Sequence, residues 1–335
     1  ERALLLRQYG LHLQLLCSRL AIDPPLVLPT ACCCRMELKQ VFTEGVYGVH
    51  FEETDSTQKY AQREFDNFPK DKLTVISADY QTAGVGKGNR TWQAVAGKSV
   101  LMTFAFHFPN TCSDAFVTRS AKNVSHVLAL SAVKVMRGAT MQFGDAFNFE
   151  LKWPNDLLLN KQKIGGILAE ARSTKGSSGS PRLGGIIIGI GINVNKSKEE
   201  LASIARPVWP AASLFSELPE SSAWVPEASP FGVAAIRDGL TVTFLHDLEL
   251  FFNKGFAAFI DSVSSLQTLR GQDIAFNTDD RKEGDHDQAQ VVRGTFTGIG
   301  TDGELLLRLP DGQERAMYSG EIVPLGGAIA SAVIS

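Results

Sequence analysis

Short runs of β-forming apolar residues alternate with polar and glycine-rich segments from about residue 45 onward, which is the pattern of a mixed helix-and-strand domain. Six strands are predicted, at 73–78, 100–106, 147–152, 156–159, 164–171 and 185–190. Apolar positions at helical spacing predict helices over 115–137 and 234–260. Two segments rich in Gly, Ser or Pro, 173–182 and 217–230, predict a turn and an insertion.

The pattern changes after residue 269. Short strands are predicted at 290–296, 303–309 and 313–318, and the turns between them carry Asp-Gly pairs. Regular short strands with such turns are typical of a small barrel. We therefore expect a catalytic-sized domain over 45–268 and a small SH3-like domain over 269–327.

Composition narrows the class of protein. A chain of 335 residues is long enough for one large core and one small core. Its 33 basic and 36 acidic side chains give a net charge of −3, which argues against nucleic-acid binding by the bulk of the chain. No apolar run reaches the roughly 18 residues that a membrane span needs. The five cysteines lack the pairing of a disulfide framework and the spacing of a zinc site, so reduced thiols are expected.

Residues 1–44 form an N-terminal extension of different composition. Residues 1–35 are rich in arginine and leucine and hold only two acids, Glu1 and Asp23. Such a segment is typical of a transit-peptide remnant, but an ordinary helix followed by a Pro-rich connector explains it equally well. The first residue is not Met, so the true start is not visible. A cytoplasmic location is predicted, or an organellar one if the segment is a transit remnant.

The first two candidate site segments combine polar side chains with glycines. Asp-Ser-Thr-Gln at 55–58 precedes an expected helix, where its hydroxyls and amide can bind a small polar ligand or simply cap the helix. The loop 81–92 holds three alternating glycines with Lys87 and Arg90, a backbone suited to wrapping a phosphate or a carboxylate. It matches neither a dinucleotide fingerprint nor a Walker loop, and a flexible surface turn is the alternative.

Two further segments lie on predicted strands. Lys-Trp-Pro-Asn-Asp at 152–156 is followed by Lys163 and a Gly pair, which predicts two lysines that face one pocket from neighbouring strands. Asn155 and Asp156 carry oxygens of the type that Mg²⁺ prefers, although a plain surface hairpin has the same pattern. At 189–195 a buried strand leaves the core through glycines into Asn193 and Asn195, either for a ligand or as a strand end.

The order and spacing of these four segments resemble the biotin–protein ligase family, also called holocarboxylase synthetases. The family's DSTN, AGRGRxxRxW, KWPND…KxxGIL and GxGxN motifs correspond to 55–58, 83–92, 152–168 and 189–193. The segment 318–322 resembles the family's C-terminal module. The resemblance implies an α+β fold, with a mixed β-sheet flanked by helices (the class II synthetase-like biotin/lipoate ligase domain) followed by an SH3-like β-barrel.

The resemblance also implies roles for individual residues. The implied catalytic residues are Lys163, Lys87 and Arg90. The implied biotin-binding residues are Ser56, Thr57, Gln58, Gln81, Gly84, Val85, Gly86, Lys87, Lys163 and Gly166. The implied ATP-binding residues are Arg90, Trp92, Lys152, Asn155, Asp156 and Asn193, with Mg²⁺ expected alongside ATP.

Three positions depart from the family pattern. Val85 and Lys87 stand where arginine is usual, and Gln58 replaces an asparagine. Lys87 keeps the positive charge but loses the bidentate fork of arginine. We therefore expect this loop, which should order when it closes over the adenylate, to retain the intermediate less tightly.

By this resemblance the chain is an ATP-dependent ligase that forms biotinyl-5′-AMP and transfers biotin to a lysine of a carboxylase's biotin carboxyl carrier domain. It is expected to act as a monomer or homodimer, without nucleic acid or membrane. A lipoate or octanoate ligase is the nearest enzymatic alternative, but the RRxxGGGxVxHD-type segment of that family is absent. A biotin-responsive repressor is the alternative from another class. Only residues 1–44 precede the catalytic region, so a complete N-terminal winged helix is not expected.

Overall fold

The computed structural model describes residues 45–88, 90–108, 115, 117, 121–175, 181–204, 209–219, 231–278 and 291–324. The predictions for the N-terminal extension and for the state of the five cysteines lie outside these residues. In the described part of the chain, no helix is long and apolar enough to cross a membrane.

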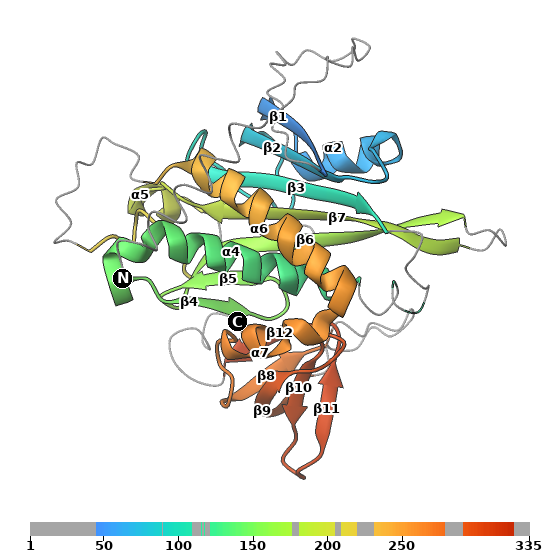
Figure 1. Ribbon diagram of the computed structural model, residues 1–335. Helices are drawn as coiled ribbons and strands as arrows, with labels where there is room; N and C mark the ends of the chain where they lie inside the picture. Colours follow the sequence, from blue (N-terminus) through green and yellow to red (C-terminus); the bar gives the residue numbers. More distant parts are fainter. Residues whose placement is uncertain are drawn as a thin grey trace, which may run out of the picture.

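A seven-stranded mixed sheet forms the centre of the molecule, in the order β1-β2-β3-β7-β6-β5-β4 (Figure 1). Its strands are β1 (Val46–Thr54), β2 (Leu73–Gln81), β3 (Ser99–His107), β4 (Phe149–Lys152), β5 (Asp156–Leu159), β6 (Gln162–Lys175) and β7 (Pro181–Asn193). β1 runs parallel to β2, and all other neighbouring pairs are antiparallel. The six predicted strands are confirmed, five of them with shifted ends and 156–159 at its predicted bounds, whereas β1 was not predicted.

Helices cover both faces of this sheet. The helices α4 (Val124–Thr140) and α6 (Val233–Lys254) pack on one face, and α2 (Thr57–Glu64) packs on the other (Figure 1). β7 shows how the sequence separates the faces, because Ile186, Ile188, Ile190 and Ile192 all belong to the core under α4 and α6. Successive strand residues point to opposite faces, so the intervening Gly189, Gly191 and Asn193 face the side of α2.

The two long helices differ from their predicted bounds. α4 begins at Val124 and ends at Thr140, several residues further along the chain than predicted. The helix predicted to reach residue 260 ends at Lys254, because Gly255 adopts a φ of 70° that an α-helix cannot contain. A 3₁₀ turn (Phe256–Ala258) and the short helix α7 (Ile260–Ser265) follow. The remaining helical elements are α5 (Lys198–Ala202) and the 3₁₀ helices Phe65–Asn67 and Met141–Ala146.

The small C-terminal domain is a five-stranded antiparallel sheet in the order β11-β10-β9-β8-β12, which confirms the SH3-like expectation. Its strands are β8 (Asp273–Asn277), β9 (Val291–Ile299), β10 (Leu305–Arg308), β11 (Glu314–Met317) and β12 (Glu321–Pro324). The turn at Gly303 joins it to the large domain, since the Gly303 carbonyl accepts a hydrogen bond from Trp153 Nε1 (3.0 Å). The α+β fold inferred from the sequence is therefore confirmed.

Candidate active site

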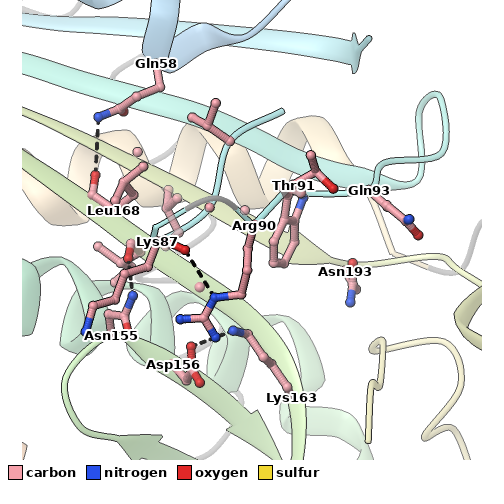
Figure 2. A pocket seen from close by; sticks show the side chains of 18 of the residues that line it. Gln58, Lys87, Arg90, Thr91, Gln93, Asn155, Asp156, Lys163, Leu168 and Asn193 are labelled. Carbon is pink, nitrogen blue, oxygen red and sulfur yellow. Dashed lines mark hydrogen bonds and ion pairs between the residues drawn. The ribbon is translucent and has the colours of Figure 1, made fainter. Parts of the chain in front are cut away.

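One cavity of about 580 Å³ collects the four candidate segments on the α2 side of the central sheet. Its walls come from the start of α2, the loop between β2 and β3, the strands β3 to β7, and β12 of the small sheet. The charged groups of Arg90, Asp156 and Lys163 lie close together in this cavity (Figure 2), and Lys87 also lines it.

Glycines on the central strands leave space above the sheet for two side chains of the cavity wall. Gly166 of β6 lies opposite Gly191 of β7, and Gly189 follows on the same face. A side chain at Gly191 would come within 2.5 Å of the Trp92 indole, and one at Gly189 within 2.6 Å of Gln58 Oε1. The glycines therefore make room for the two side chains that wall the cavity.

One end of the cavity is neutral and rich in hydrogen-bonding groups. Ser56 caps α2, as the capping alternative predicted, with its Oγ 3.5 Å from the Lys59 amide. Thr57 donates to Gln81 Oε1 from both its backbone N (2.7 Å) and its Oγ1 (3.1 Å). Thr103 in turn donates to Thr57 Oγ1 (2.8 Å). Such a connected network holds polar groups in place for a small polar ring.

The opposite end is basic. Asp156 on β5 lies between two lysines on the flanking strands, with Lys163 Nζ at 2.6 Å and Lys152 Nζ at 3.6 Å. Burial alone would raise the pKa of the Asp156 carboxyl, but the two ammonium groups hold it below its ordinary value. Burial lowers the pKa of Lys152, opposed by the nearby Asp156. Two lysines against one carboxylate leave net positive charge toward an anionic ligand.

The lysines share one pocket as predicted, but they do not lie on adjacent strands. Lys152 ends β4 and Lys163 lies near the start of β6, with β5 between them. The strand predicted at 156–159 already lay between them in the sequence, and consecutive antiparallel pairing keeps it between them in the sheet.

The loop between β2 and β3 folds back over the cavity. Trp92 N donates to Gly84 O (3.0 Å) and Gly86 N donates to Arg90 O (2.8 Å). Arg90 reaches across to the small domain, where its Nη2 lies 2.8 Å from Glu321 Oε1 of β12. The small domain thus contributes directly to the wall of the site.

Two buried polar atoms facing this region have no hydrogen-bond partner among the described residues, Trp92 Nε1 and Asn193 Oδ1. Both residues line the cavity. Buried donors and acceptors are nearly always paired in folded proteins, so this donor and this acceptor suit a polar ligand. Lys196, which donates to Gln93 O at 2.5 Å, supports the Trp92 wall from behind.

The structure brings every predicted site residue into the cavity wall except Gly84, a residue of the same loop whose carbonyl accepts a hydrogen bond from Trp92 N. Thr103, Trp209 and Glu321 also line the cavity and were not predicted. Thr103 lies in a largely apolar strand at the same alternation as Ser99 and His107. Its alternation with the core residues Met102 and Phe104 is the signal that it faces away from that core. Nothing in the sequence indicates that Glu321 reaches this site.

The residues present do not fit a protein-bound Mg²⁺ ion. Both Asp156 oxygens are paired with ammonium groups, and Asn155 Nδ2 donates to Ile167 O at 2.8 Å. In the described part of the chain, no group of three or more His, Cys, Asp or Glu residues is arranged to hold a metal ion.

Fold and site together define a class: an α+β protein whose largest described cavity is polar at one end and basic at the other and is lined by a glycine-rich loop and by a strand of the small β-sheet. Comparison with known proteins agrees. The family model described as "Biotin/lipoate A/B protein ligase family" matches residues 50–193, and the one described as "Biotin protein ligase C terminal domain" matches residues 287–323. The chain belongs to the biotin–protein ligase family.

Curated relatives and solved structures extend this likeness over most of the chain. The bifunctional ligase/repressor BirA of Bacillus spizizenii is 27% identical over 282 residues, covering 83% of this chain and 74% of the relative. The protein of the same name from Escherichia coli is 24% identical over 272 residues, covering 80% and 71%. The biotin protein ligase from Aquifex aeolicus in complex with biotin and ATP has a similar fold, with a TM-score of 0.58 at 23% identity over 82% of this chain and 97% of that chain.

Proposed function

We propose that this chain is an ATP-dependent biotin–protein ligase, which activates biotin as biotinyl-5′-AMP and transfers the biotinyl group to a lysine of a biotin carboxyl carrier domain. The observation that carries the proposal is the single cavity that holds a hydrogen-bonding end and a basic end side by side. The hydrogen-bonding end suits the ureido ring of biotin, and the basic end suits the reaction of a carboxylate with a phosphate.

Activation joins two anions, so charge is the main contribution of the protein. The biotin carboxylate attacks the α-phosphorus of ATP, the bond from that phosphorus to the bridging oxygen breaks, and pyrophosphate leaves. Lys163 lies at the basic end of the cavity, and Lys87 and Arg90 come from the loop between β2 and β3 that also lines it (Figure 2). In this assignment the three cations stabilise the charge that develops on the reacting oxygens.

The nucleotide lies on the Trp92 side in this proposal. Trp92 and Asn193 offer a buried indole N–H and an amide oxygen, and Lys152 adds charge beneath Trp209, whose ring lies 5.3 Å from Lys152 Nζ. Asn155 and Asp156 shape this wall rather than bind metal, so Mg²⁺ would enter as the counterion of ATP.

The second step needs no nucleophile from this chain. The ε-amine of the carrier lysine attacks the acyl carbon of the mixed anhydride, the acyl–oxygen bond breaks, and AMP leaves while the amine loses a proton. Until then the adenylate must be kept from water, which is the role we assign to the loop from Gly84 to Arg90. Its glycines permit closure.

The partner in this scheme is an apo carrier domain of a carboxylase. The catalytic domain ends at residue 268, and the small domain that follows adds Glu321 to the cavity wall. A cytoplasmic or organellar location and a monomeric or homodimeric state complete the proposal. Each of these is open to direct measurement by fractionation and by light scattering.

The experiment that tests the function measures the intact mass of an apo biotin carrier domain after incubation with the protein, biotin, ATP and Mg²⁺. A gain of one biotinyl group that depends on ATP is expected. Pyrophosphate release is followed in the same tube. Release without transfer would mean that the carrier is wrong, and no release of pyrophosphate would overturn the proposed activity.

Lipoate and octanoate are tested in parallel, because the matching family description includes lipoate ligases. A ring that donates and accepts hydrogen bonds can pair with the polar groups of Thr57, Gln81 and Thr103, which strengthens its binding. A simple alkyl chain cannot pair with those groups. We expect biotin alone to support rapid pyrophosphate release. Faster release with octanoate would favour the alternative.

A further inference from the structure

Glu170 lies on β6 just beyond the hydrogen-bonding end of the cavity and does not itself line it. Its Oε2 accepts hydrogen bonds from the side-chain amides of two α2 residues, Gln58 at 2.8 Å and Gln62 at 2.5 Å. A half-buried carboxylate that accepts two such bonds is a strong acceptor in a fixed place. It therefore imposes an orientation on both amides.

For Gln58 this orientation decides which atom the cavity sees. Its Nε2 faces two acceptors, Glu170 Oε2 at 2.8 Å and Leu168 O at 3.5 Å. Figure 2 shows the second of these contacts. Its Oε1 lies on the other side, 3.4 Å from Thr103 Oγ1 and directly above Gly189. An amide has one donor side and one acceptor side. Since Gln58 lines the cavity, the side left for a ligand is the acceptor.

Gln81 presents the opposite polarity from the neighbouring strand. Its Oε1 already accepts two hydrogen bonds from Thr57, so Nε2 is the group left to donate. The end of the cavity thus offers one acceptor, Gln58 Oε1, and one donor, Gln81 Nε2. A cyclic urea carries the complement of this pair, with N–H groups beside a carbonyl oxygen.

We propose that Glu170 is a positioning residue that contributes to the choice of the carboxylic acid substrate. Glu170 holds the Gln58 side-chain oxygen toward the ligand, so the cavity prefers an acid whose ring carries N–H donors. This inference rests on the proposed function, because it takes biotin as the acid. Glu170 touches no ligand in this scheme and acts only through Gln58.

The test compares Glu170→Gln, Gln58→Met and the double variant in pyrophosphate release. A glutamine at position 170 offers both a donor and an acceptor, so the Gln58 amide loses its imposed orientation. We expect the KM for biotin to rise about tenfold in each single variant while the KM for ATP stays within twofold. In the Gln58→Met background, Glu170→Gln should have no additional effect on the KM for biotin.

Gln62→Met is the matched control, because it removes the other amide from the same carboxylate and leaves Gln58 in place. Its KM for biotin should match that of the wild type. Biotin methylated at the ureido nitrogens is the ligand control. The wild type should have a much lower KM for biotin than for the methylated acids. The ratio of these KM values should fall about tenfold in Glu170→Gln.

Two results would overturn the inference while the wild type remains active with biotin. The first is an unchanged KM for biotin in Glu170→Gln. The second is that Glu170→Gln raises the KM for biotin by the same factor in the Gln58→Met background as in the wild type, which would mean that Glu170 acts independently of Gln58. If Glu170→Gln does not fold, the Gln58→Met variant is assayed with biotin and with the methylated acids. If that variant still discriminates between biotin and the methylated acids as strongly as the wild type does, the role of the Gln58 oxygen is contradicted. A wild type inactive with biotin would instead remove the proposed function itself.

Discussion

Asp156 lies between two lysines, and this arrangement limits what each lysine can do. Lys163 makes the short contact to the carboxylate, at 2.6 Å, and its side chain is 31% exposed, so it is the lysine that can reach a substrate. Lys152, at 3.6 Å and 7% exposed, supports the pair from below. At the scale of single residues, we therefore expect Lys163 to be the lysine of this pair that acts on the substrate.

Replacing Lys163 by alanine should lower the rate of adenylate formation on the order of 10²- to 10³-fold, because one charge-stabilising group is typically worth about 3 to 4 kcal/mol in a transition state. The measurement is pyrophosphate release from the purified variant with biotin and ATP. Lys161→Ala is the matched control, because Lys161 pairs with Glu150 away from the cavity. Near-normal release from Lys163→Ala would contradict the assignment.

Lys87→Arg should retain biotinyl-AMP longer than the wild type does, about three- to tenfold, because an arginine fork can hold a phosphate through two parallel hydrogen bonds. Lys87 lies in the loop beside Arg90, whose Nε donates to the Lys87 carbonyl at 3.1 Å. The rate at which labelled adenylate escapes after gel filtration measures the effect. Lys87→Gln, without the charge, should release it faster than either. Equal escape rates for Lys and Arg would refute the idea.

At the scale of elements, strands with clear apolar runs were predictable and context-dependent elements were not. The strand at 156–159 was predicted at its observed bounds, because an unbroken run of leucines follows a turn residue. The strand β1 was not predicted, because Val46–Thr54 contains a glycine and ends in polar residues. Its apolar residues Val49 and Phe51 are buried by packing against α2, a contact that the sequence alone does not indicate. The break of α6 depended on Gly255 adopting a positive φ, which a sequence permits but does not require.

The alternation of isoleucine and glycine along β7 yields a prediction for that element. Gly191→Ala places a methyl group 2.5 Å from the Trp92 ring, so the indole must shift away from the sheet. We expect the KM for ATP to rise about tenfold and the KM for biotin to change little, as steady-state kinetics would show. Gly138→Ala on α4 is the control, since no atom lies within 4 Å of the added carbon there. That change should stabilise the protein by about 0.5–1 kcal/mol. Unaltered ATP kinetics in Gly191→Ala would contradict the placement of the nucleotide.

At the scale of the whole molecule, sheet order assembles the site. The sequence segments 56–58, 81–92, 152–166 and 189–193 converge because β7 inserts between β3 and β6, which no local pattern indicates. Their convergence was anticipated only through the resemblance to a family. The contact of Arg90 with Glu321 spans 231 residues of sequence and lay beyond any argument from spacing. Residue types and strand faces can thus be read from the chain, whereas the meeting of two domains over one cavity cannot.

The junction of the two domains should make stability depend on pH through His126. This side chain lies between α4 and the small domain, with Nε2 3.2 Å from the Gly303 carbonyl, and burial lowers its pKa to about 4. An unfolded histidine titrates near 6.5, so the unfolded state binds more protons in the interval between these values. Stability should therefore fall as pH falls from about 6.5 to about 4, and the histidine should contribute no further change outside that interval.

Between pH 7 and pH 5 this histidine should cost on the order of 2 kcal/mol in the free energy of unfolding. The measurement is urea unfolding at both values, followed by circular dichroism. His126→Gln should lose that part of the pH dependence while keeping a donor for Gly303, although its stability at pH 7 is expected to be lower. His246→Gln is the control, because its side chain is 77% exposed on α6, and it should retain the wild-type slope. If His126→Gln and the wild type lose the same stability at pH 5, the domain junction is not the pH-sensitive element. If they differ as expected, the buried neutral His126, which shares the Gly303 carbonyl with Trp153, is the group at the domain junction that links stability to pH.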